Sequence, residues 1–220
     1  MSEYALRRSR LERLYHEYLV DQDSAALVRK VTESYSIGTL ERLLHGGARM
    51  GRRAAAMALG YLADFRSNHP LGLALHDDDR AVRLLAENAL RSIWCRDGND
   101  EQRQSLAEII RLNVAREYED AIDRADHLIA SACELAEAWN QRAVAYFSLG
   151  RYHRSIDDCR QAVELNAYHF GAVAGMGQCY LKLGNELWAL DCFRRALSLN
   201  PNLEGIRANV SRLERKLRRD

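Results

Sequence analysis

The chain has 220 residues, with 32 Lys and Arg against 31 Asp and Glu, so its formal net charge is only +1. This length can bury a substantial core, and 47% hydrophobic with 29% charged residues excludes an intrinsically disordered chain. The near balance of charge also excludes a global basic field for nucleic acid. Ala and Leu number 30 and 31, whereas Val, Ile and Thr together number 19. Because Ala and Leu favour helices and β-branched residues favour strands, the composition predicts an all-α protein.

The N-terminal residues 1–36 are predicted to form two helices that cap the region that follows. The first is polar and Arg-rich, and the second runs over Ser24–Tyr35 with Asp23 or Ser24 as its N-cap. Charges are mixed throughout the first twenty residues, so no secretory signal is expected. The most apolar stretch, 53–62, is too short to cross a bilayer. We therefore expect a cytoplasmic protein without a membrane contact.

A repeat of 31 residues follows. Shifting the stretch 40–59 by 31 positions gives eight identities, which pair Leu40 with Leu71, His45 with His76 and Arg52 with Arg83 among others. Each repeat has the pattern of a short helix, a tight turn and a longer helix, with apolar residues at helical spacing. The turn residues Asp77, Asp78 and Asp79 can cap the free N–H groups of the longer helix.

These residues resemble the HEAT family of helical repeats. The stretch LGLALHDDDRAVRLLAENAL carries a turn Asp followed by Val-Arg and an Ala-rich helix, at Asp77, Val82 and Arg83. The first repeat keeps Arg52 but has Gly46 and Gly51 at the Asp and Val positions. The resemblance implies HEAT-like helix pairs over residues 37–96, with Asp and Arg pairing between neighbouring turns.

A second repeat, of 34 residues, occupies 101–203. A shift of 34 pairs Tyr146 with Tyr180, Gly150 with Gly184 and Asn166 with Asn200. This period resembles that of tetratricopeptide (TPR) repeats. Trp139 and Tyr146 match the large aromatic positions of the first helix, and an earlier repeat, 102–135, is degenerate.

The last segment, 204–220, is predicted to be an amphipathic helix that caps the repeats. The turn residues Arg96–Asp100 are expected to join the HEAT-like and TPR regions. Together these features predict a right-handed α-solenoid of helix–turn–helix repeats. Whether its two halves form one rigid body is left open.

The sequence carries no motif for catalysis, a cofactor or a metal. It has no Gly-rich phosphate loop after a strand, no HExxH and no CxxC. His45 and His76 alone are too few for a metal site, and Asp77–Asp79 are explained by capping. The five cysteines are an odd set, four of them in apolar helical patterns, so reduced, buried thiols are expected. We therefore predict a protein that is not an enzyme and needs no cofactor.

The predicted function is a protein-interaction adaptor or scaffold, because helical solenoids bind peptides or helices along their concave faces. The TPR resemblance places eight residues in such a groove: Asn140, Gln141, Val144, Phe147, Ala174, Gln178, Leu181 and Lys182. The alternative is that Val144, Phe147 and Leu181 pack under the terminal helix. Leu187 and Trp188 are candidates for a second contact surface or a dimer interface, or for packing against the neighbouring helix.

The partner is predicted to be a protein other than a chaperone C-terminal tail. TPR domains that grip such tails place Lys, Asn and Arg at set positions, where this chain has Leu106, Ile110, Gln141, Gly171 and Gly175. One alternative is an RNA-associated scaffold that uses the Arg-rich last helix, although no aromatic residues alternate with its arginines to stack bases. Another is an auxiliary, lyase-like HEAT subunit of an enzyme, which would need a reactive thiol or a pocket.

Overall fold

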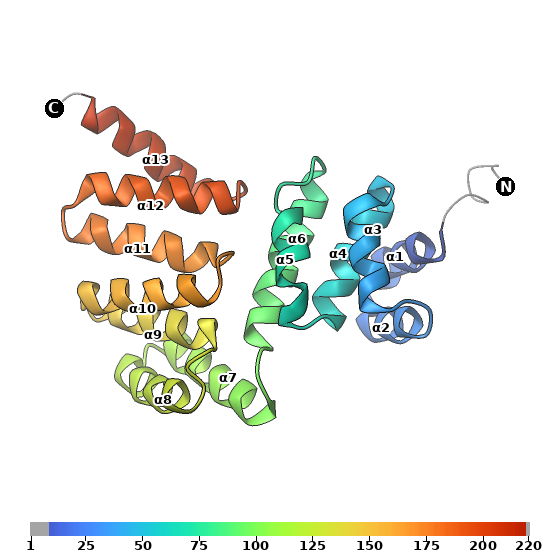
Figure 1. Cartoon of the computed structure of the whole chain (residues 1–220), viewed down its shortest axis with the longest axis horizontal. Helices are drawn as coiled ribbons and strands as arrows, with labels where there is room; N and C mark the ends of the chain where they lie inside the picture. The colour runs from blue at the N-terminus through green and yellow to red at the C-terminus, as the bar shows by residue number, and fades with distance from the viewer. Residues whose placement is uncertain (1–8, 219–220) are drawn as a thin grey trace. The chain divides into compact units, whose positions relative to one another are not determined.

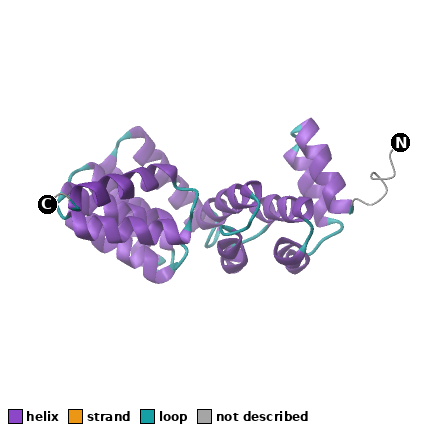
Figure 2. Cartoon of the chain, turned by 90° about the horizontal axis from the view of Figure 1, so that it is seen from above, coloured by secondary structure: helices purple, strands orange, loops and turns teal. Residues whose placement is uncertain are grey.

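A computed structural model describes residues 9–218, and within that range every regular element is a helix (Figure 2). The all-α class predicted from the composition is therefore confirmed. The chain divides into two compact units, unit 1 (Met1–Ile93) and unit 2 (Trp94–Asp220). Among the described residues, none of the helices combines the length and the apolar character that a bilayer crossing needs.

Unit 1 is built from short helices with polar caps. Its elements are α1 (Arg10–Asp21), α2 (Ser24–Thr32), α3 (Ile37–Gly46), α4 (Arg49–Leu62), η2 (Phe65–Ser67), α5 (Asn68–Ala74) and α6 (Arg80–Cys95). Ser9 and Glu12 form a capping box at the start of α1, and the Asp23 carboxylate accepts the Ala26 N–H at the start of α2. Polar side chains thus satisfy N–H groups that would otherwise have no helical partner.

Two arginines on α4 are paired with the turn that precedes α6. Arg52 donates from Nε and Nη2 to the two carboxylate oxygens of Asp77, at 2.7 and 2.9 Å. Arg53 binds both oxygens of Asp79, at 2.8 and 2.6 Å. The first repeat thus pairs forward with the acidic turn of the second repeat, although it lacks an Asp of its own at that position. Such two-pronged pairs fix geometry as well as charge.

One aspartate of this turn, Asp79, also caps α6. Asp79 Oδ1 accepts the N–H groups of Ala81 and Val82, at 3.0 and 3.1 Å. The Arg53 guanidinium, together with these N–H groups, holds the pKa of Asp79 well below its usual range. Burial would raise the pKa of Asp77, but the hydrogen bonds from Arg52 and the Asp79 N–H and the charge of Arg52 together outweigh it, and the pKa is lowered. Both side chains therefore remain ionised at neutral pH.

Unit 2 stacks its helices in chain order from α8 to α13 (Figure 1). Its helices are α7 (Asp100–Ala115), α8 (Tyr118–Ser131), α9 (Ala136–Ser148), α10 (Tyr152–Leu165), α11 (Phe170–Lys182), α12 (Glu186–Leu199) and α13 (Glu204–Leu217). The pairs α7–α8, α9–α10 and α11–α12 pack together, and each pair also contacts the next. This is the architecture of an α-solenoid.

The three pairs of unit 2 share one turn geometry. Each turn has one left-handed residue within two positions of the end of the first helix: Arg116, Gly150 or Gly184, with φ of 66°, 75° and 75°. In each turn the following N–H reaches back five residues, from Glu117 to Leu112, from Arg151 to Tyr146 and from Asn185 to Tyr180. The degenerate repeat at 102–135 therefore has the same turn as the two regular repeats. Its Arg116 occupies a conformation that favours glycine.

Close packing within unit 2 depends on a small residue at one helix crossing. A Cβ on Gly177 would lie 2.5 Å from the ring of Phe193, which is fully buried. At the C-terminal end, Val210 and Leu213 of α13 are buried against Leu190 and Phe193 of α12. The apolar face of α13 is thereby covered, as a capping helix requires.

The prediction that the cysteines are buried is correct for three of the five and wrong for the other two. Cys159, Cys179 and Cys192 are buried, whereas Cys95 and Cys133 are exposed. Cys95 ends α6 and Cys133 lies in the turn before α9, where the apolar periodicity of the helices no longer applies. Burial raises the pKa of Cys192 to about 11, so this thiol stays protonated.

The left-handed turn at Gly184 gives a stability prediction. A Cβ at Gly184 meets no atom within 4 Å, so Gly184→Ala tests the backbone conformation alone. We expect it to lower the free energy of unfolding by about 1 kcal/mol. Gly205, on α13, is equally uncrowded but has no positive φ, so Gly205→Ala should instead raise that free energy by about 0.5 kcal/mol. Urea unfolding followed by circular dichroism measures both, and equal effects of the two variants would refute the assignment of strain.

Candidate peptide-binding surface

The eight residues predicted for the groove lie on the first helices of two successive pairs. Helix α9 carries Asn140, Gln141, Val144 and Phe147, and α11 carries Ala174, Gln178, Leu181 and Lys182. Helix α9 contacts both α7 and α11, so the first helices of the three pairs form one continuous layer. The structure thus brings the two sets into neighbouring rows of the same unit.

The two amides on α9 are bound to a buried carboxylate of their own helix. Gln141 Nε2 and Asn140 Nδ2 both donate to Glu137 Oε1, at 2.6 and 3.0 Å. Glu137 is only 7% exposed. Asn140 and Gln141 therefore do not project freely into solvent to bind a peptide backbone, and each has part of its hydrogen-bonding capacity already used.

A histidine at the N-cap of the next helix pair completes the shell of this carboxylate. His169 Nε2 lies 2.9 Å from Glu137 Oε2, and the Ala172 N–H lies 3.1 Å from His169 Nδ1. Because Nδ1 accepts the N–H that begins α11, the proton of the neutral ring must be on Nε2, from which it is donated to Glu137. His169 is thus an N-cap for α11 and a donor to α9 at once.

The charge on Glu137 is stabilised by these donors. Burial alone would raise its pKa, but the hydrogen bond and electrostatic attraction of His169, with the amides of Gln141 and Asn140, lower it below its ordinary value. A buried carboxylate that accepts three hydrogen bonds is compatible with a stable core. Sequence periodicity did not reveal this residue, because Glu137 lies in the first turn of a helix, where an exposed glutamate is common.

The network extends to the first helix pair through Asn113 on α7. Its Nδ2 donates to the backbone oxygen and to Oε1 of Gln141, at 2.9 and 3.0 Å. One connected set of polar groups therefore joins α7, α9 and α11. We refer to Asn113, Glu137, Asn140, Gln141 and His169 as the amide–carboxylate network.

The apolar residues of the α9 row differ in exposure. Val144 is 41% exposed, and it is the most accessible apolar side chain on this helix. Phe147 is half-buried, with its ring 5.5 Å from that of Tyr152 on α10. Val144 is thus available to a ligand, while Phe147 also supports the pairing of α9 with α10.

The α11 row is more closely tied to the core. Ala174 packs on the cluster around Val173 and Met176, and Leu181 packs on the terminal cluster that includes Val210 and Leu213. Gln178 is half-buried and Lys182 is exposed. The row therefore offers a polar amide and a cation at the surface, with its apolar residues partly covered.

Leu187 and Trp188, the candidates for a second contact, are both exposed, at 68% and 58%. Trp188 lies at the start of α12 with its ring 6.1 Å from that of Tyr180, in a stacked arrangement. The two rings line a cavity of about 370 Å³ between α10 and α12. This surface is separate from the rows on α9 and α11.

The clamp positions used to exclude a chaperone tail do not all face a groove. Leu106 is fully buried in the core of α7–α9, and Ile110 is partly buried against the same core. A basic residue would not be expected at a buried position whatever the ligand. The absence of lysine there consequently gives no support for excluding a chaperone tail.

The arginines of the last helix are exposed, but several bind the protein itself. Arg207 is bonded to the Pro201 carbonyl, Arg212 to Asn209, and Arg215 to the Ser211 carbonyl. Arg219, near the end of the chain, and Arg7 and Arg8, in the Arg-rich N-terminal segment, lie outside the described residues. Within residues 9–218, no three His, Cys, Asp or Glu side chains come together as metal ligands would.

Comparison with known proteins identifies the repeats of unit 2. The tetratricopeptide repeat family profile matches residues 136–169 and 174–203. These two stretches are TPR repeats. A TPR repeat-containing protein of Rhizobium etli is 33% identical over 97 residues, which cover 44% of this chain and 48% of that protein. Sperm-associated antigen 1 of Rattus norvegicus is 29% identical over 102 residues, or 46% of this chain and 11% of that protein. The chain thus spans half or less of these relatives.

Two solved TPR domains have the same fold as unit 2. The second TPR domain of human RPAP3, in complex with the HSP70 peptide SGPTIEEVD, is 26% identical, with a TM-score of 0.50, and the match covers 53% of this chain and 98% of that domain. The first TPR of Spaghetti, bound to the HSP90 peptide SRMEEVD, is 22% identical with a TM-score of 0.52 over 55% of this chain and 95% of that one. The latter similarity concerns the fold alone.

The amide–carboxylate network predicts a pH-dependent effect of Glu137→Gln. The new NH2 group would face a donor, so we expect the variant to lose about 1–3 kcal/mol of unfolding free energy at pH 7. Because the pKa of Glu137 is lowered by folding, its stabilisation is complete above its ordinary value of 4.5 and is lost as the pH falls through the folded value. Urea unfolding of wild type and variant should therefore differ equally at pH 8 and 6, and progressively less below pH 4.5.

The control for this variant is Glu134→Gln, since Glu134 is an exposed carboxylate in the same turn region. It should leave the stability within about 0.5 kcal/mol of wild type at every pH. A difference for Glu137→Gln that does not change between pH 6 and pH 4 would show that ionisation of Glu137 does not stabilise the fold.

Proposed function

We propose that this chain is a non-catalytic adaptor that binds a peptide segment of a partner protein along α9 and α11 of unit 2. The observation that carries the proposal is that the groove residues of α9 and α11 lie on neighbouring helices, and that the amide–carboxylate network joins these helices. A surface that is ordered before binding loses less conformational entropy when a ligand docks. The complex of the RPAP3 TPR domain with a peptide supports the same use of this fold.

The ligand is proposed to contact Val144 and Phe147 with an apolar side chain and Gln178 and Lys182 with polar groups. Val144 supplies exposed apolar area, and the exposed Lys182 supplies a positive charge at the end of the α11 row. Asn140 and Gln141 would act mainly by holding the row in place, with their remaining donors and acceptors open to a backbone. We also propose that the helix pairs of unit 1 are HEAT-like repeats, because Arg52 of the first repeat forms an ion pair with Asp77 in the turn of the second.

We propose that the ligand is not a chaperone C-terminal tail. The α9 and α11 rows offer one lysine to an acidic tail, and no arginine that points away from the core, because Arg142 is bound to Asp158 and Asp126. The acidic HSP70 peptide in the complex of the second RPAP3 TPR domain points the other way. Fluorescence anisotropy with labelled SGPTIEEVD decides between them, since micromolar binding would identify the acidic tail as a ligand.

The groove itself is tested with Val144→Glu. Because Val144 is already 41% exposed, the variant should fold, while a charge at the centre of the row should weaken partner binding at least tenfold. Wild type and variant are compared as affinity baits in lysate of the source organism, with captured proteins quantified by mass spectrometry. Val20→Glu places the same change on α1 of unit 1, where Val20 is 72% exposed, and serves as the control. Equal recovery of partners by Val144→Glu and Val20→Glu would contradict the assignment of the groove.

A further inference from the structure

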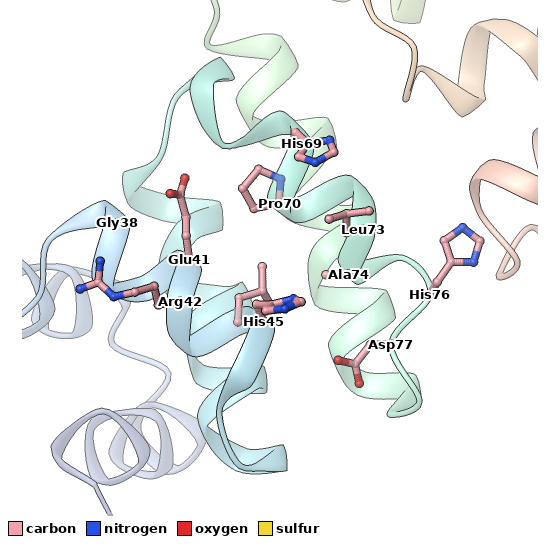
Figure 3. A pocket seen from close by; sticks show the side chains of 11 residues that line it. Gly38, Glu41, Arg42, His45, His69, Pro70, Leu73, Ala74, His76 and Asp77 are labelled. Carbon is pink, nitrogen blue, oxygen red and sulfur yellow. The ribbon is translucent and has the colours of Figure 1, made fainter.

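Unit 1 contains a cavity of its own, of about 560 Å³, between α3 and α5 (Figure 3). A volume of this size is within the range of ligand sites. Arg42 and His45 line it from α3, His69 lines it from α5, and His76 lines it from the turn that follows. The cavity is thus bordered by one guanidinium and three imidazoles from two successive repeats.

The basic groups around this cavity retain unused hydrogen-bond donors. The Arg42 guanidinium donates to the Thr39 hydroxyl of its own helix, at 3.0 Å, and has five N–H donors in all. His45 and His76 are exposed, and within residues 9–218 neither imidazole has a hydrogen-bond partner. Such donors can gain hydrogen bonds from a ligand without first losing protein contacts.

The two carboxylates at the cavity are already engaged. Glu41 accepts the Ser67 hydroxyl, at 2.6 Å, and Asp77 is held by Arg52 at 2.7 and 2.9 Å. Arg52 also pairs with the exposed Asp78. The acidic side chains are therefore directed toward the protein, whereas the unsatisfied groups are donors. An acceptor-rich ligand fits this arrangement.

The cavity also has an apolar wall. Leu44 and Ala74 are buried, and Leu73 is 52% exposed beside them. A ligand that fills the site would thus combine an aliphatic group with a carboxylate. A metal ion does not fit, because the described residues contain no group of three ligands.

We propose that this cavity binds an acidic peptide segment of a partner protein, with separate carboxylates at Arg42 and at His45 and an adjacent aliphatic side chain against Leu73. The site belongs to unit 1 and is independent of the groove on α9 and α11. Carboxylate recognition by a guanidinium is strong when two N–H groups are available, and the aliphatic contact supplies burial that charge alone does not.

The fixed charges at this site are balanced. From α3 the cavity faces Glu41 and Arg42, whose formal charges cancel, and Asp77 is balanced by Arg52 from α4. Asp78 is directed to Arg52 at the rim. Recognition of an anion here therefore depends on the hydrogen-bond donors that Arg42 and His45 present.

The probe is a fluorescein-labelled octapeptide of alternating glutamate and valine with a free C-terminus. Its counterpart replaces glutamate by glutamine and ends in an amide. Anisotropy titrations with the full chain at pH 6.0 are expected to give saturable binding of the acidic peptide and no saturable binding of the counterpart. The double variant Arg42→Gln/His45→Gln should weaken binding at pH 6.0 at least tenfold.

The matched control is Arg13→Gln/His16→Gln, the same pair of residue types at the same spacing on α1, both exposed. It should bind the peptide as wild type does. A second measurement needs no variant: the acidic peptide should protect His45 from carbethoxylation by diethylpyrocarbonate, read by mass spectrometry, while His16 and His153 stay reactive.

Three results would overturn the proposal. The first is no binding of the acidic peptide, and the second is equal loss in both double variants, which would place the peptide elsewhere. The third is unchanged modification of His45 at saturating peptide. None of these results bears on the groove of unit 2, whose test uses Val144.

Discussion

The buried carboxylate of Glu137 is the group on which the order of unit 2 depends. A charge at 7% exposure is stable only when hydrogen-bond donors surround it. Those donors come from α9 itself and from His169, at the start of α11, and Asn113 on α7 is tied to Gln141 of the same shell. The three first helices consequently have one relative register, because sliding any of them would leave a buried charge or amide unpaired. The positions of Val144 and Gln178 follow from that register.

In unit 1, ion pairs hold neighbouring repeats together at the turn before α6. Arg52 and Arg53 of α4 hold Asp77 and Asp79. Asp79 in turn accepts N–H groups at the start of α6, and Asp77 accepts the N–H of Asp79 within the turn. Each aspartate thus connects two repeats and also orders the backbone that leads into α6. Half-buried, two-pronged pairs of this kind restrict motion more than exposed single pairs do. The cavity between α3 and α5 ends at this turn, through Asp77, so its shape is supported by the same contacts.

The periodic features were predictable from sequence, and the cross-repeat polar contacts were not. The 34-residue period placed the turns at Gly150 and Gly184, and the Asp23 cap of α2 followed from residue type. These depend on local backbone preferences that a short window of sequence records. The partners Glu137 and His169 are 32 residues apart, and each has an ordinary role in isolation, as a first-turn acid and a residue before a helix. Only the stacking of repeats brings them together. Burial of Leu106 was missed for a similar reason, because family positions locate a groove residue without showing what covers it.

The two surfaces differ in how their polar groups are used, and this difference determines what each can recognise. On α9 the amides are already paired, so they contribute rigidity, and recognition there depends on shape and on exposed apolar area such as Val144. At the unit 1 cavity the carboxylates are paired, whereas Arg42 keeps donors beyond its bond to Thr39 and His45 is exposed, so the proposed ligand gains hydrogen bonds that the free protein lacks. A paired group costs free energy to redirect, whereas an unpaired exposed donor exchanges only water for ligand. The two proposed sites therefore differ in selectivity, for charge in unit 1 and for shape in unit 2.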